Sequence, residues 1–398
     1  MDIKLLLSRI QNTSYVFEVK GLSLNSQNVK KGDLFIAIQG GQKHGSEFVD
    51  QAIENGCVAV LTENKDIECD VPSIRIDNLS SCLSILAQNF YQEAKNVKLI
   101  AITGTNGKTS VSHFISQILE SLNVKNGVIG TLGISQLAKK TINTTPDIFT
   151  IYSALHEFSN QGIKLVIVEA SSHALHQKRL AGLSFIQGVF TNLTQDHLDY
   201  HKTMGEYREA KAKLFSNNRT AKAIINRDDE NYQYFLDITS EIETETFSIN
   251  DLGYFKTNEK GFICELNNFV FELPLLGQFN ISNALAAYSS LKSLGYNDAE
   301  VIPALSKLLP PLGRMQKLNE SNIWIDYAHT PDALINALKT LKDHYPDSKI
   351  RVLFGCGGDR DKTKRQLMGK IASENAHSII ITNDNPRSEN PEQIINDI

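Results

Sequence analysis

The clearest chemical pattern lies at positions 103–110, which read Thr-Gly-Thr-Asn-Gly-Lys-Thr-Ser. They follow an apolar run and precede a helical pattern of apolar residues. In such a loop, glycines let backbone N–H groups turn toward phosphate oxygens, and the start of the helix adds a favourable dipole. Lys108 would reach the β- and γ-phosphates, and the Thr109 hydroxyl would bind Mg²⁺. The pattern predicts a nucleotide-binding loop made of Gly104, Thr105, Asn106, Gly107, Lys108, Thr109 and Ser110.

One position departs from the full phosphate-loop pattern, because Ile102 stands where that pattern has a glycine. The alternative is a glycine-rich turn before a helix that starts with threonine. The order of strand, loop, Gly-Lys-Thr and helix favours the nucleotide site.

Carboxylates and imidazoles follow other apolar runs. Glu169 ends the run at 165–168, where a carboxylate beside a phosphate loop can bind the magnesium of a nucleotide. Residues 196–201, Asp-His-Leu-Asp-Tyr-His, suit metal binding or acid–base chemistry, although a loop with hydrogen-bonded histidines is the commoner arrangement. An amphipathic helix is predicted over 206–215, with Glu209 and Lys213 paired, and spacing alone does not single out Lys211.

Three weaker patterns also contain charged residues. Residues 226–229, Asn-Arg-Asp-Asp, fit a guanine-reading pattern by letter, but no DxxG switch lies between them and the phosphate loop, so GTP is discounted. Arg314 follows a Pro-Pro-Leu-Gly break and is either a cation that reaches a bound phosphate across a domain junction or a surface arginine. The glycines of 355–361 lack GxGxxG spacing, so they give little support to a dinucleotide-binding fold. Arg387 in the turn 384–387 is either solvated or buried against a carboxylate, where it would determine specificity.

The elements that must position these residues are predicted to form a parallel sheet. Apolar runs at 97–102, 164–168, 185–190 and 221–225 each precede a polar loop or a helix, which is typical of βαβ units whose ligands collect at the carboxyl ends of the strands. A smaller α/β unit precedes them, and three more strand-and-helix units, starting at 322–326, 349–354 and 378–382, follow the proline break. The predicted domains are 1–94, 95–312 and 313–398.

Composition limits the function classes. The 398 residues are 41% hydrophobic and 21% charged, as in globular proteins, and their net charge of −5 excludes a broad basic face for nucleic acid. Five scattered cysteines suggest reduced thiols rather than disulfides or a zinc site. With no signal-like start and no apolar run long enough to cross a bilayer, the sequence predicts a cytoplasmic protein without membrane insertion.

Taken in order, the motifs resemble those of the Mur ligase family. They are 104–109 (GTNGKT), 143–146 (NTTP), 169–173 (EASSH), 191–201 (TNLTQDHLDYH), 209–211 (EAK), 326–331 (DYAHTP) and 357–361 (GGDRD). The resemblance runs from about Leu24 to the last residue and is strongest to the members that add the third residue of the peptidoglycan stem peptide. It implies an α/β fold of three domains: a small UDP-binding domain, a central P-loop ATPase domain with a mostly parallel sheet, and a Rossmann-like C-terminal domain.

The resemblance implies an ATP-dependent amide ligation in a protein expected to be a monomer. A carboxylate of UDP-N-acetylmuramoyl-L-alanyl-D-glutamate would be phosphorylated by ATP, and the amine of meso-diaminopimelate would then displace phosphate. Lys108 and two magnesium ions would neutralise the converging anions. Thr109 would serve one magnesium ion, and Glu169, His197 and a CO₂-derived carbamate on Lys211 would serve the second.

The remaining binding roles also follow from the resemblance. The nucleotide would contact Asn283, Arg314 and Asp326. The uridine diphosphate end of the substrate would contact Leu24, Ser26 and Gln42, although the chain has Asn25-Ser26-Gln27 where the family usually has Asp-Ser-Arg. The muramoyl dipeptide would lie along Asn143, Thr144, Thr145, Ser172, Gln177 and Arg179.

The amino acid selected depends on 384–387, Asp384-Asn385-Pro386-Arg387, which accompanies meso-diaminopimelate in the family. Arg387 and Arg360 would attract its extra carboxylate and repel the ammonium group of L-lysine. Family members continue past the position of Ile398 with a Gly and a Glu for the diaminopimelate ammonium, so an incomplete C-terminal domain is expected. The alternatives are an L-lysine-adding homologue, a folylpolyglutamate synthetase-like ligase, and a non-catalytic nucleotide or UDP-sugar binder.

Overall fold

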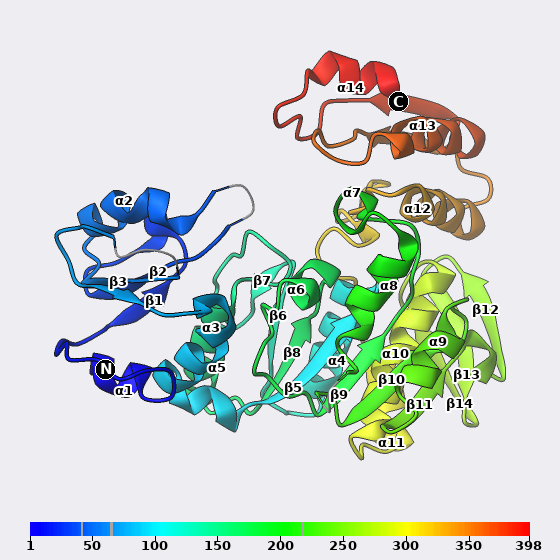
Figure 1. Ribbon diagram of the computed structural model, residues 1–398. Coiled ribbons are helices and arrows are strands. Elements are labelled where there is room, and N and C mark those ends of the chain that lie inside the picture. The colour runs from blue at the N-terminus through cyan, green and yellow to red at the C-terminus, as the bar shows by residue number, and fades with distance from the viewer. Residues whose placement is uncertain (41–42, 64–66, 217–218) are drawn as a thin grey trace.

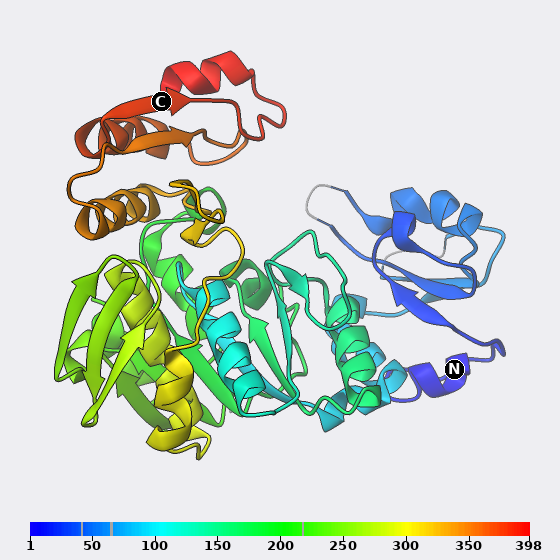
Figure 2. The same ribbon diagram turned by 180° about the vertical axis from the view of Figure 1, so that it is seen from behind.

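The protein folds into three regions in chain order. The computed structural model describes residues 1–40, 43–63, 67–216 and 219–398. Figures 1 and 2 show the N-terminal region beside one end of a larger central region and the C-terminal region above the other part of it, apart from the N-terminal region. No helix within the described residues is long and apolar enough to cross a membrane.

The N-terminal region is a parallel sheet flanked by helices. Its strand order is β1-β2-β3-β4. In β2, Phe35 and Ala37 join a small core with α2, whereas Leu34 and Ile36 face a larger core shared with the central region, as alternation along a strand requires. The bounds are β1 Gly21–Ser23, β2 Asp33–Ala37, β3 Ala59–Thr62, β4 Ser73–Arg75, α1 Ile3–Leu7, α2 Val49–Glu54 and α3 Leu79–Phe90, with 3₁₀ turns at Ser26–Asn28, Gly45–Phe48 and Gln92–Asn96.

The central region is built on a seven-stranded sheet with the order β11-β10-β9-β5-β8-β6-β7. The β6–β7 pair is antiparallel and every other pair is parallel, which confirms the predicted mostly parallel α/β fold. The strands are β5 Lys98–Thr103, β6 Gly127–Gly130, β7 Gly133–Ile134, β8 Leu165–Glu169, β9 Gln187–Phe190, β10 Lys222–Asn226 and β11 Glu243–Phe247.

Helices bury both faces of this sheet. In the middle strand β5, Leu99 and Ala101 point into the core shared with α3 and α5, while Ile100 and Ile102 point into a second core with α4 and α10. A strand covered on both faces is apolar throughout, which explains the continuous apolar run at 97–102. The helices are α4 Lys108–Ser121, α5 Ile148–Asn160, α6 Ser172–His176, α7 Leu198–His201, α8 Met204–Ala212, α9 Tyr232–Ile238, α10 Gln278–Ser293 and α11 Asp298–Leu305, with a 3₁₀ turn at Ile249–Asp251.

A small antiparallel sheet, which the sequence analysis did not predict, follows the central strands. It has the order β12-β13-β14, with bounds Tyr254–Asn258, Gly261–Leu266 and Phe269–Leu273. The second hairpin turns at Asn267 and Asn268, whose φ angles are 50° and 67°. Consecutive asparagines at positive φ are typical of tight hairpin turns.

The C-terminal region corrects one prediction. The first of its three strands was expected to begin a strand-and-helix unit, but β16 (Trp324–Ile325) pairs antiparallel with β15 (Gln316–Lys317). A hydrogen bond from Leu318 N to Ile323 O closes this hairpin, so the chain folds back directly after the proline break. The other two strands pair in parallel as predicted. The remaining bounds are α12 Pro331–His344, β17 Arg351–Phe354, α13 Thr363–Asn375, β18 Ser378–Ile381 and α14 Pro391–Asp397.

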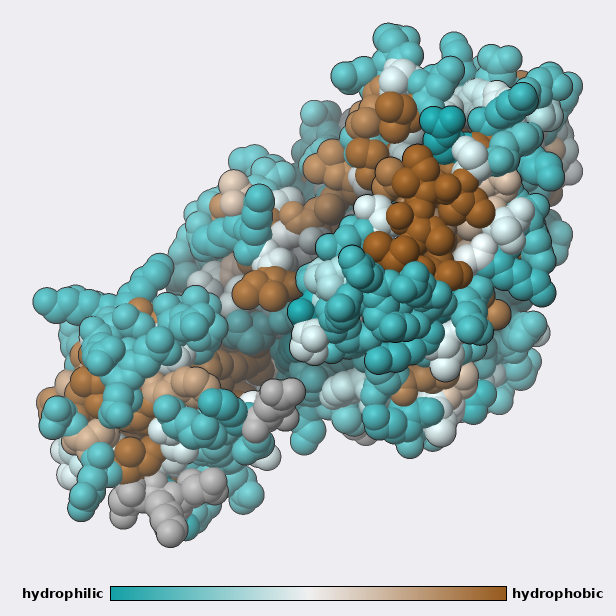
Figure 3. Space-filling view, turned by 90° about the horizontal axis from the view of Figure 1, so that it is seen from above, coloured by the Kyte–Doolittle hydropathy of each residue, from teal (hydrophilic) through white to brown (hydrophobic). Residues whose placement is uncertain are grey.

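One face of the β17–β18 pair is open. Val352, Ile379 and Ile381 pack against the core formed with α12, α13 and α14. On the other face, Leu353 is 64% exposed and Ile380 is 44% exposed. Figure 3, seen from above the view of Figure 1, shows a hydrophobic area on the part of the molecule where the C-terminal region lies. Parallel strands are usually covered on both faces, so this face of the region is bare.

Candidate active site

The predicted phosphate loop joins the end of β5 to the start of α4. Gly104 and Gly107 have φ angles of 154° and 86°. A Cβ on Gly107 would lie 2.4 Å from Oδ1 of Asn283, and a Cβ on Gly104 would lie 1.9 Å from Oγ1 of Thr191. Both positions therefore require glycine, for backbone conformation and for space. Asn283 in α10 thus lies directly against the loop.

Lys108, the first residue of α4, folds back over this loop. Its Nζ donates to the carbonyl oxygens of Gly104 and Thr105, each at 2.8 Å. Burial lowers the pKa of Lys108 to about 8, while the charges of Glu169 and Asp196 oppose that shift. The ammonium group is therefore held over the loop with nearby carboxylates as its compensating charges.

Glu169 lies at the end of β8, beside β5, and its side chain is fully buried. One carboxylate oxygen accepts from the backbone N–H of Thr131 at 3.0 Å, and the other accepts from the hydroxyls of Thr109 and Thr131, each at 2.9 Å. Burial raises the pKa of Glu169, and these hydrogen bonds and Lys108 counteract it. The sequence analysis missed Thr131 as a site residue. Its position directly after the short run at 127–130 could have indicated a polar residue at the end of a strand.

The segment after β9 braces the phosphate loop from the other side. The backbone N–H of Asn106 donates to Oδ1 of Asn192 at 2.9 Å, and Oγ1 of Thr191 donates to the carbonyl of Asn106 at 2.6 Å. The hydroxyl of Tyr207 in α8 donates to Oγ1 of Thr105 at 3.1 Å. The loop conformation is thus fixed by hydrogen bonds from neighbouring elements.

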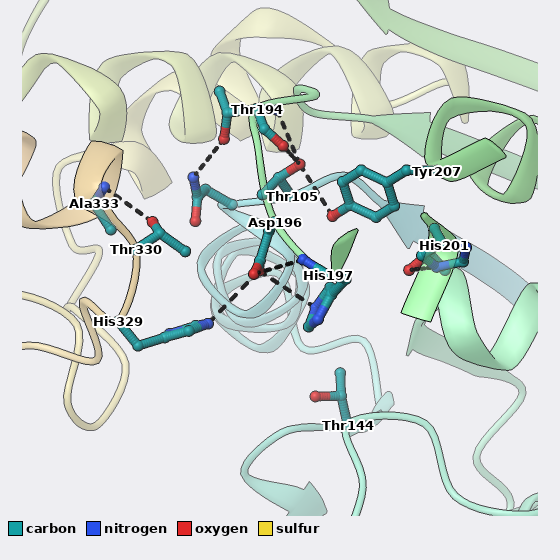
Figure 4. A network of polar contacts seen from close by, with 12 residues as sticks. Thr105, Thr144, Thr194, Asp196, His197, His201, Tyr207, His329, Thr330 and Ala333 are labelled. Carbon is teal, nitrogen blue, oxygen red and sulfur yellow. Dashed lines mark hydrogen bonds and ion pairs between the residues drawn. The ribbon is translucent and has the colours of Figure 1, made fainter. Parts of the chain in front are cut away.

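Asp196 connects two imidazoles from different regions, as Figure 4 shows. Its Oδ2 lies 3.3 Å from Nε2 of His197 and 3.7 Å from Nε2 of His329, and its Oδ1 accepts from the backbone N–H of His197. His197 has a φ of 55°, a left-handed conformation that places its ring beside the carboxylate. Burial lowers the pKa of His197 to about 3, so the ring is neutral near pH 7.

Lys211 is buried in α8, with 1% of its surface exposed. Its Nζ donates to the carbonyl of Gly104 at 2.7 Å and lies 4.2 Å from the ring centroid of Tyr207. Burial, with Lys108 as a nearby like charge, holds the pKa of Lys211 well below its ordinary value. Its amine therefore faces the same loop as Lys108, in surroundings that disfavour the protonated form.

Oxygen donors dominate the part of this cluster that suits a divalent cation. The Glu169 carboxylate and the Thr109 and Thr131 hydroxyls are the hard ligands that Mg²⁺ prefers. No group of three or more His, Cys, Asp or Glu side chains in the described ranges is arranged to hold a metal ion. The residues around Glu169 therefore fit a magnesium that also uses hydroxyl and substrate oxygens, and the two-metal arrangement stays a prediction.

Thr144 and Thr145, two of the residues predicted for the muramoyl dipeptide, lie beside Glu169. The Thr144 hydroxyl lies 3.1 Å from the Thr131 hydroxyl, and the Thr145 hydroxyl donates to the Glu169 carbonyl at 2.6 Å. Arg179 donates to the Thr145 carbonyl at 2.7 Å and, through Nε, to Gln177 at 3.0 Å. The hydroxyl of Ser172 lies 2.9 Å from Nε2 of His201, and Asn143 lies on the exposed start of the same loop as Thr144.

The three uridine-end predictions fall in the N-terminal region. The Ser26 hydroxyl donates to Gln51 at 2.6 Å, and Leu24 packs against the core shared by the first two regions. Gln42 lies outside the described residues. Leu24 and Ser26 are not brought into the cluster around Glu169, because they lie in the N-terminal region (Figure 1).

Arg314 and Asp332 of the C-terminal region contact the phosphate loop. Arg314 donates to Oγ1 of Thr109 at 3.2 Å, and its guanidinium carbon lies 4.6 Å from the Tyr327 ring centroid. Asn106 donates to Asp332 at 3.2 Å, a contact that the sequence analysis missed. Asp326, by contrast, accepts from the backbone N–H of Met315 within its own region.

The predicted amino-acid residues lie on two adjoining loops after β17 and β18. Arg387 donates to the carbonyl of Gly358 at 2.6 Å, and the backbone N–H of Gly358 donates to Asn385 at 2.9 Å. A Cβ on Gly358 would lie 1.9 Å from the Pro386 carbonyl, and the nearest neighbours of a Cβ on Gly355 would include Asp384. Burial lowers the pKa of His173 in the central region, and the charge of Arg360 acts in the same direction.

Three family models match the chain in order. They are described as Mur ligase family, catalytic domain (residues 18–91), Mur ligase middle domain (102–291) and Mur ligase, glutamate ligase domain (313–398). A relative from Buchnera aphidicola, UDP-N-acetylmuramoyl-L-alanyl-D-glutamate–2,6-diaminopimelate ligase, is 40% identical over 95% of this chain and 82% of its own length. The protein of the same name from Geobacillus thermodenitrificans is 37% identical over 96% and 82%.

Solved structures agree with these relatives. A structure of a UDP-N-acetylmuramoyl-L-alanyl-D-glutamate–2,6-diaminopimelate ligase superimposes with a TM-score of 0.70 at 36% identity, over 95% of this chain and 81% of the other. The MurF ligase from Thermotoga maritima in complex with ADP shares the fold, with a TM-score of 0.67 at 19% identity over 95% and 86%. The chain therefore belongs to the Mur ligase family, whose members are ATP-dependent enzymes that form amide bonds.

Proposed function

We propose that the chain joins meso-diaminopimelate to UDP-N-acetylmuramoyl-L-alanyl-D-glutamate in peptidoglycan precursor synthesis, as its relatives are named to do. The observation that carries the proposal is the convergence of Lys108, Glu169 and Lys211 on the phosphate loop, with Arg314 reaching Thr109 from the C-terminal region. The enzyme acts as a cytoplasmic monomer. Residues 1–94 hold the uridine end, 95–312 hold ATP and 313–398 hold the amino acid.

The first step is phosphoryl transfer. ATP lies with its phosphates on the backbone N–H groups of 104–110 and on Lys108, with adenine near Asn283, whose side chain adjoins the loop. Arg314 and Asp326 contact its phosphate and ribose from the C-terminal region. A carboxylate oxygen of the glutamyl substrate attacks the γ-phosphorus, the bond to ADP breaks, and an acyl phosphate forms. The cations of Lys108 and Arg314 offset the repulsion between the two anions.

Thr109, Glu169, His197 and Lys211 would hold the magnesium ions, which when bound would neutralise phosphate charge and activate the γ-phosphoryl group. The oxygen-rich surroundings of Glu169 support this assignment. Burial lowers the pKa of Lys211, which favours the unprotonated amine that adds to CO₂, so Lys211 suits a carbamate. A carbamate there would supply an anionic oxygen ligand, and the nearby charge of Lys108 would compensate it.

The second step is amide formation. The dipeptide lies along Asn143, Thr144, Thr145, Ser172, Gln177 and Arg179, and Leu24, Ser26 and Gln42 hold the uridine diphosphate. The amine nitrogen of meso-diaminopimelate attacks the acyl carbon, a proton leaves the nitrogen, and the tetrahedral intermediate expels phosphate. Arg360 and Arg387 bind the carboxylate at the far end of the amino acid, with Asp384, Asn385 and Pro386 shaping the turn that presents Arg387.

A phosphate-release assay tests the proposal. The enzyme is supplied with ATP, magnesium and UDP-N-acetylmuramoyl-L-alanyl-D-glutamate, and meso-diaminopimelate is compared with L-lysine. We expect phosphate release and a tripeptide product with meso-diaminopimelate only. Turnover with L-lysine alone would contradict the assigned amino acid, and ATP binding without turnover on either amino acid would favour the non-catalytic binder.

A further inference from the structure

The loop that carries Arg387 is tied along its length to the loop after β17. Gly358 donates to the Asn385 carbonyl and accepts from Arg387, and the carboxylate of Asp359 accepts from the hydroxyl and the backbone N–H of Ser388 at 2.7 and 3.2 Å. Arg387 itself has a φ of 51°, which an arginine adopts only where its surroundings impose it. The direction of its side chain therefore depends on what fixes the two loops.

Glu389, two residues beyond Arg387, joins the two loops to each other and to a buried side chain. Its Oε1 accepts from the backbone N–H of Asp359 at 2.6 Å and from the guanidinium of Arg365 at 2.9 Å. Its Oε2 lies 2.9 Å from Nζ of Lys362, a side chain that is 66% exposed. Arg365 holds the pKa of Glu389 at about 2, so the carboxylate is charged throughout the working range of pH.

Arg365 anchors this arrangement from inside the region. It is the largest of the fully buried side chains, at 1% exposed, and it comes from α13 rather than from either loop. Its second guanidinium nitrogen donates to Asp397 in α14 at 2.6 Å. A buried guanidinium is retained only where carboxylates compensate it, and Arg365 has one partner in the Arg387 loop and one in the last helix.

We propose that Arg365 and Glu389 are positioning residues that set the direction of Arg387 and thereby the preference for an amino acid with a second carboxylate. This inference rests on the proposed function, because it concerns the same amino-acid site. Attraction between a guanidinium and a carboxylate depends on bidentate geometry, so a shift of the loop by about an ångström weakens binding of meso-diaminopimelate without removing the charge of Arg387.

Replacing Glu389 by glutamine tests the inference. Glu389→Gln keeps an oxygen for the Asp359 N–H but weakens the pair with Arg365. Its matched control is Asp397→Asn, which weakens the other pair of the same arginine and leaves the Arg387 loop untouched. Lys362→Met is a second control, because it removes the exposed partner of Glu389 and leaves the pair with Arg365 in place. For each variant, KM for meso-diaminopimelate, KM for ATP, kcat, the meso-diaminopimelate to L-lysine preference and the melting temperature are measured.

We expect Glu389→Gln to raise KM for meso-diaminopimelate at least about tenfold and to reduce the preference over L-lysine, with KM for ATP unchanged. Asp397→Asn should lower the melting temperature with little change in that KM. Arg365→Lys, which keeps the charge but cannot bond both carboxylates as a fork, should resemble Glu389→Gln in KM and serves if that variant does not fold.

Three results separate this inference from the proposed function. An unchanged KM for meso-diaminopimelate in Glu389→Gln and Arg365→Lys, with an active parent enzyme, refutes the positioning role alone. Equal rises in KM for Glu389→Gln and Asp397→Asn also refute it, because Arg365 would then act only through general stability. A parent enzyme that does not use meso-diaminopimelate refutes the proposed function, and the inference falls with it.

Discussion

Thr131 donates to Glu169 twice, through its backbone N–H at 3.0 Å and through its hydroxyl at 2.9 Å. The two residues come from the ends of neighbouring parallel strands, β6 and β8. The approach is possible because the residue before Thr131 is Gly130, on which a Cβ would lie 2.0 Å from the Glu169 carboxylate. The orientation of this buried carboxylate is therefore set by the strand beside it.

Gly130→Ala should inactivate the enzyme while leaving it folded. The added methyl group must displace the Glu169 carboxylate, and a displacement of about an ångström at a catalytic group costs about a hundredfold in rate. The phosphate-release assay measures the loss, and circular dichroism checks the fold.

The control is Gly205→Ala in α8, where the nearest atom to a built Cβ is Oγ1 of Thr203 at 3.8 Å. This change should leave kcat and KM near those of the parent. Full activity in Gly130→Ala would mean that Glu169 need not keep this orientation.

Lys211→Ala should abolish turnover, and short-chain carboxylic acids should restore part of it. The reason is that a small carboxylate can occupy the place of the missing carbamate in the cavity left by the buried side chain. Carbon-13 bicarbonate should give a carbamate resonance in the parent enzyme that the variant lacks.

Lys213→Ala is the matched control, because Lys213 lies at the C-terminal cap of the same helix but is exposed. It should retain both the activity and the carbamate resonance. Unchanged activity in Lys211→Ala would rule out the carbamate role.

The parts of the site that could be predicted from the sequence are those set by local chemistry. The phosphate loop lies between β5 and α4 where the Gly-Lys-Thr pattern places it, and Glu169 ends β8 as the apolar run before it indicates. The position of a strand end or of a loop glycine depends on residues nearby in the sequence, so both can be predicted from a single sequence. The family resemblance added Lys211, which spacing alone did not distinguish from other lysines on its helix.

The contacts between regions could not be predicted in this way. Asn106 meets Asp332 across 226 positions, and Asp196 meets His329 although neither carries a local signal for the other. The sequence analysis wrongly predicted that the strand at 322–326 begins a strand-and-helix unit, whereas Trp324–Ile325 pairs antiparallel in a hairpin. The reason is related. The short apolar run, 323–325, fits a parallel unit as well as a hairpin, and the bonds to the residues just after the proline break decide between them.

The free energy of unfolding should fall as pH decreases from about 6.5 toward about 4, partly through His201. This ring is 3% exposed and lies 2.9 Å from the Ser172 hydroxyl, and burial, with His173 and Lys211 nearby, lowers its pKa to about 4. The unfolded chain, with the ordinary pKa of 6.5, binds the proton first, so stability is full above 6.5 and is lost below it.

Urea unfolding at about pH 7.5 and about pH 5 measures this loss. His201→Gln should reduce the difference between the two conditions by roughly 1–2 kcal/mol, because one titrating group is removed. His197 contributes in the same direction and remains in the variant. An undiminished difference would show that His201 titrates normally in the folded enzyme.

Arg314→Lys should raise KM for ATP about tenfold without a comparable change in KM for the UDP substrate. The guanidinium stacks on the Tyr327 ring and donates to Thr109 at the same time, and an ammonium group cannot reproduce that planar geometry. Steady-state kinetics with varied ATP measure the effect. Tyr327→Leu, which removes the ring but not the cation, should show a smaller rise, whereas equal KM values in parent and Arg314→Lys would contradict a nucleotide role for Arg314.

Arg387→Ala should shift the amino-acid preference from meso-diaminopimelate toward L-lysine rather than simply lower activity. Removing the guanidinium takes away the partner of the distal carboxylate of meso-diaminopimelate, so kcat/KM for that amino acid should fall roughly tenfold to hundredfold. The same change removes the repulsion of the L-lysine ammonium group, so kcat/KM for L-lysine should rise. Competition between the two amino acids in one reaction, with products separated by mass, measures both effects together. Equal losses for both would mean that Arg387 supports the loop through its bond to Gly358 and does not read the side chain.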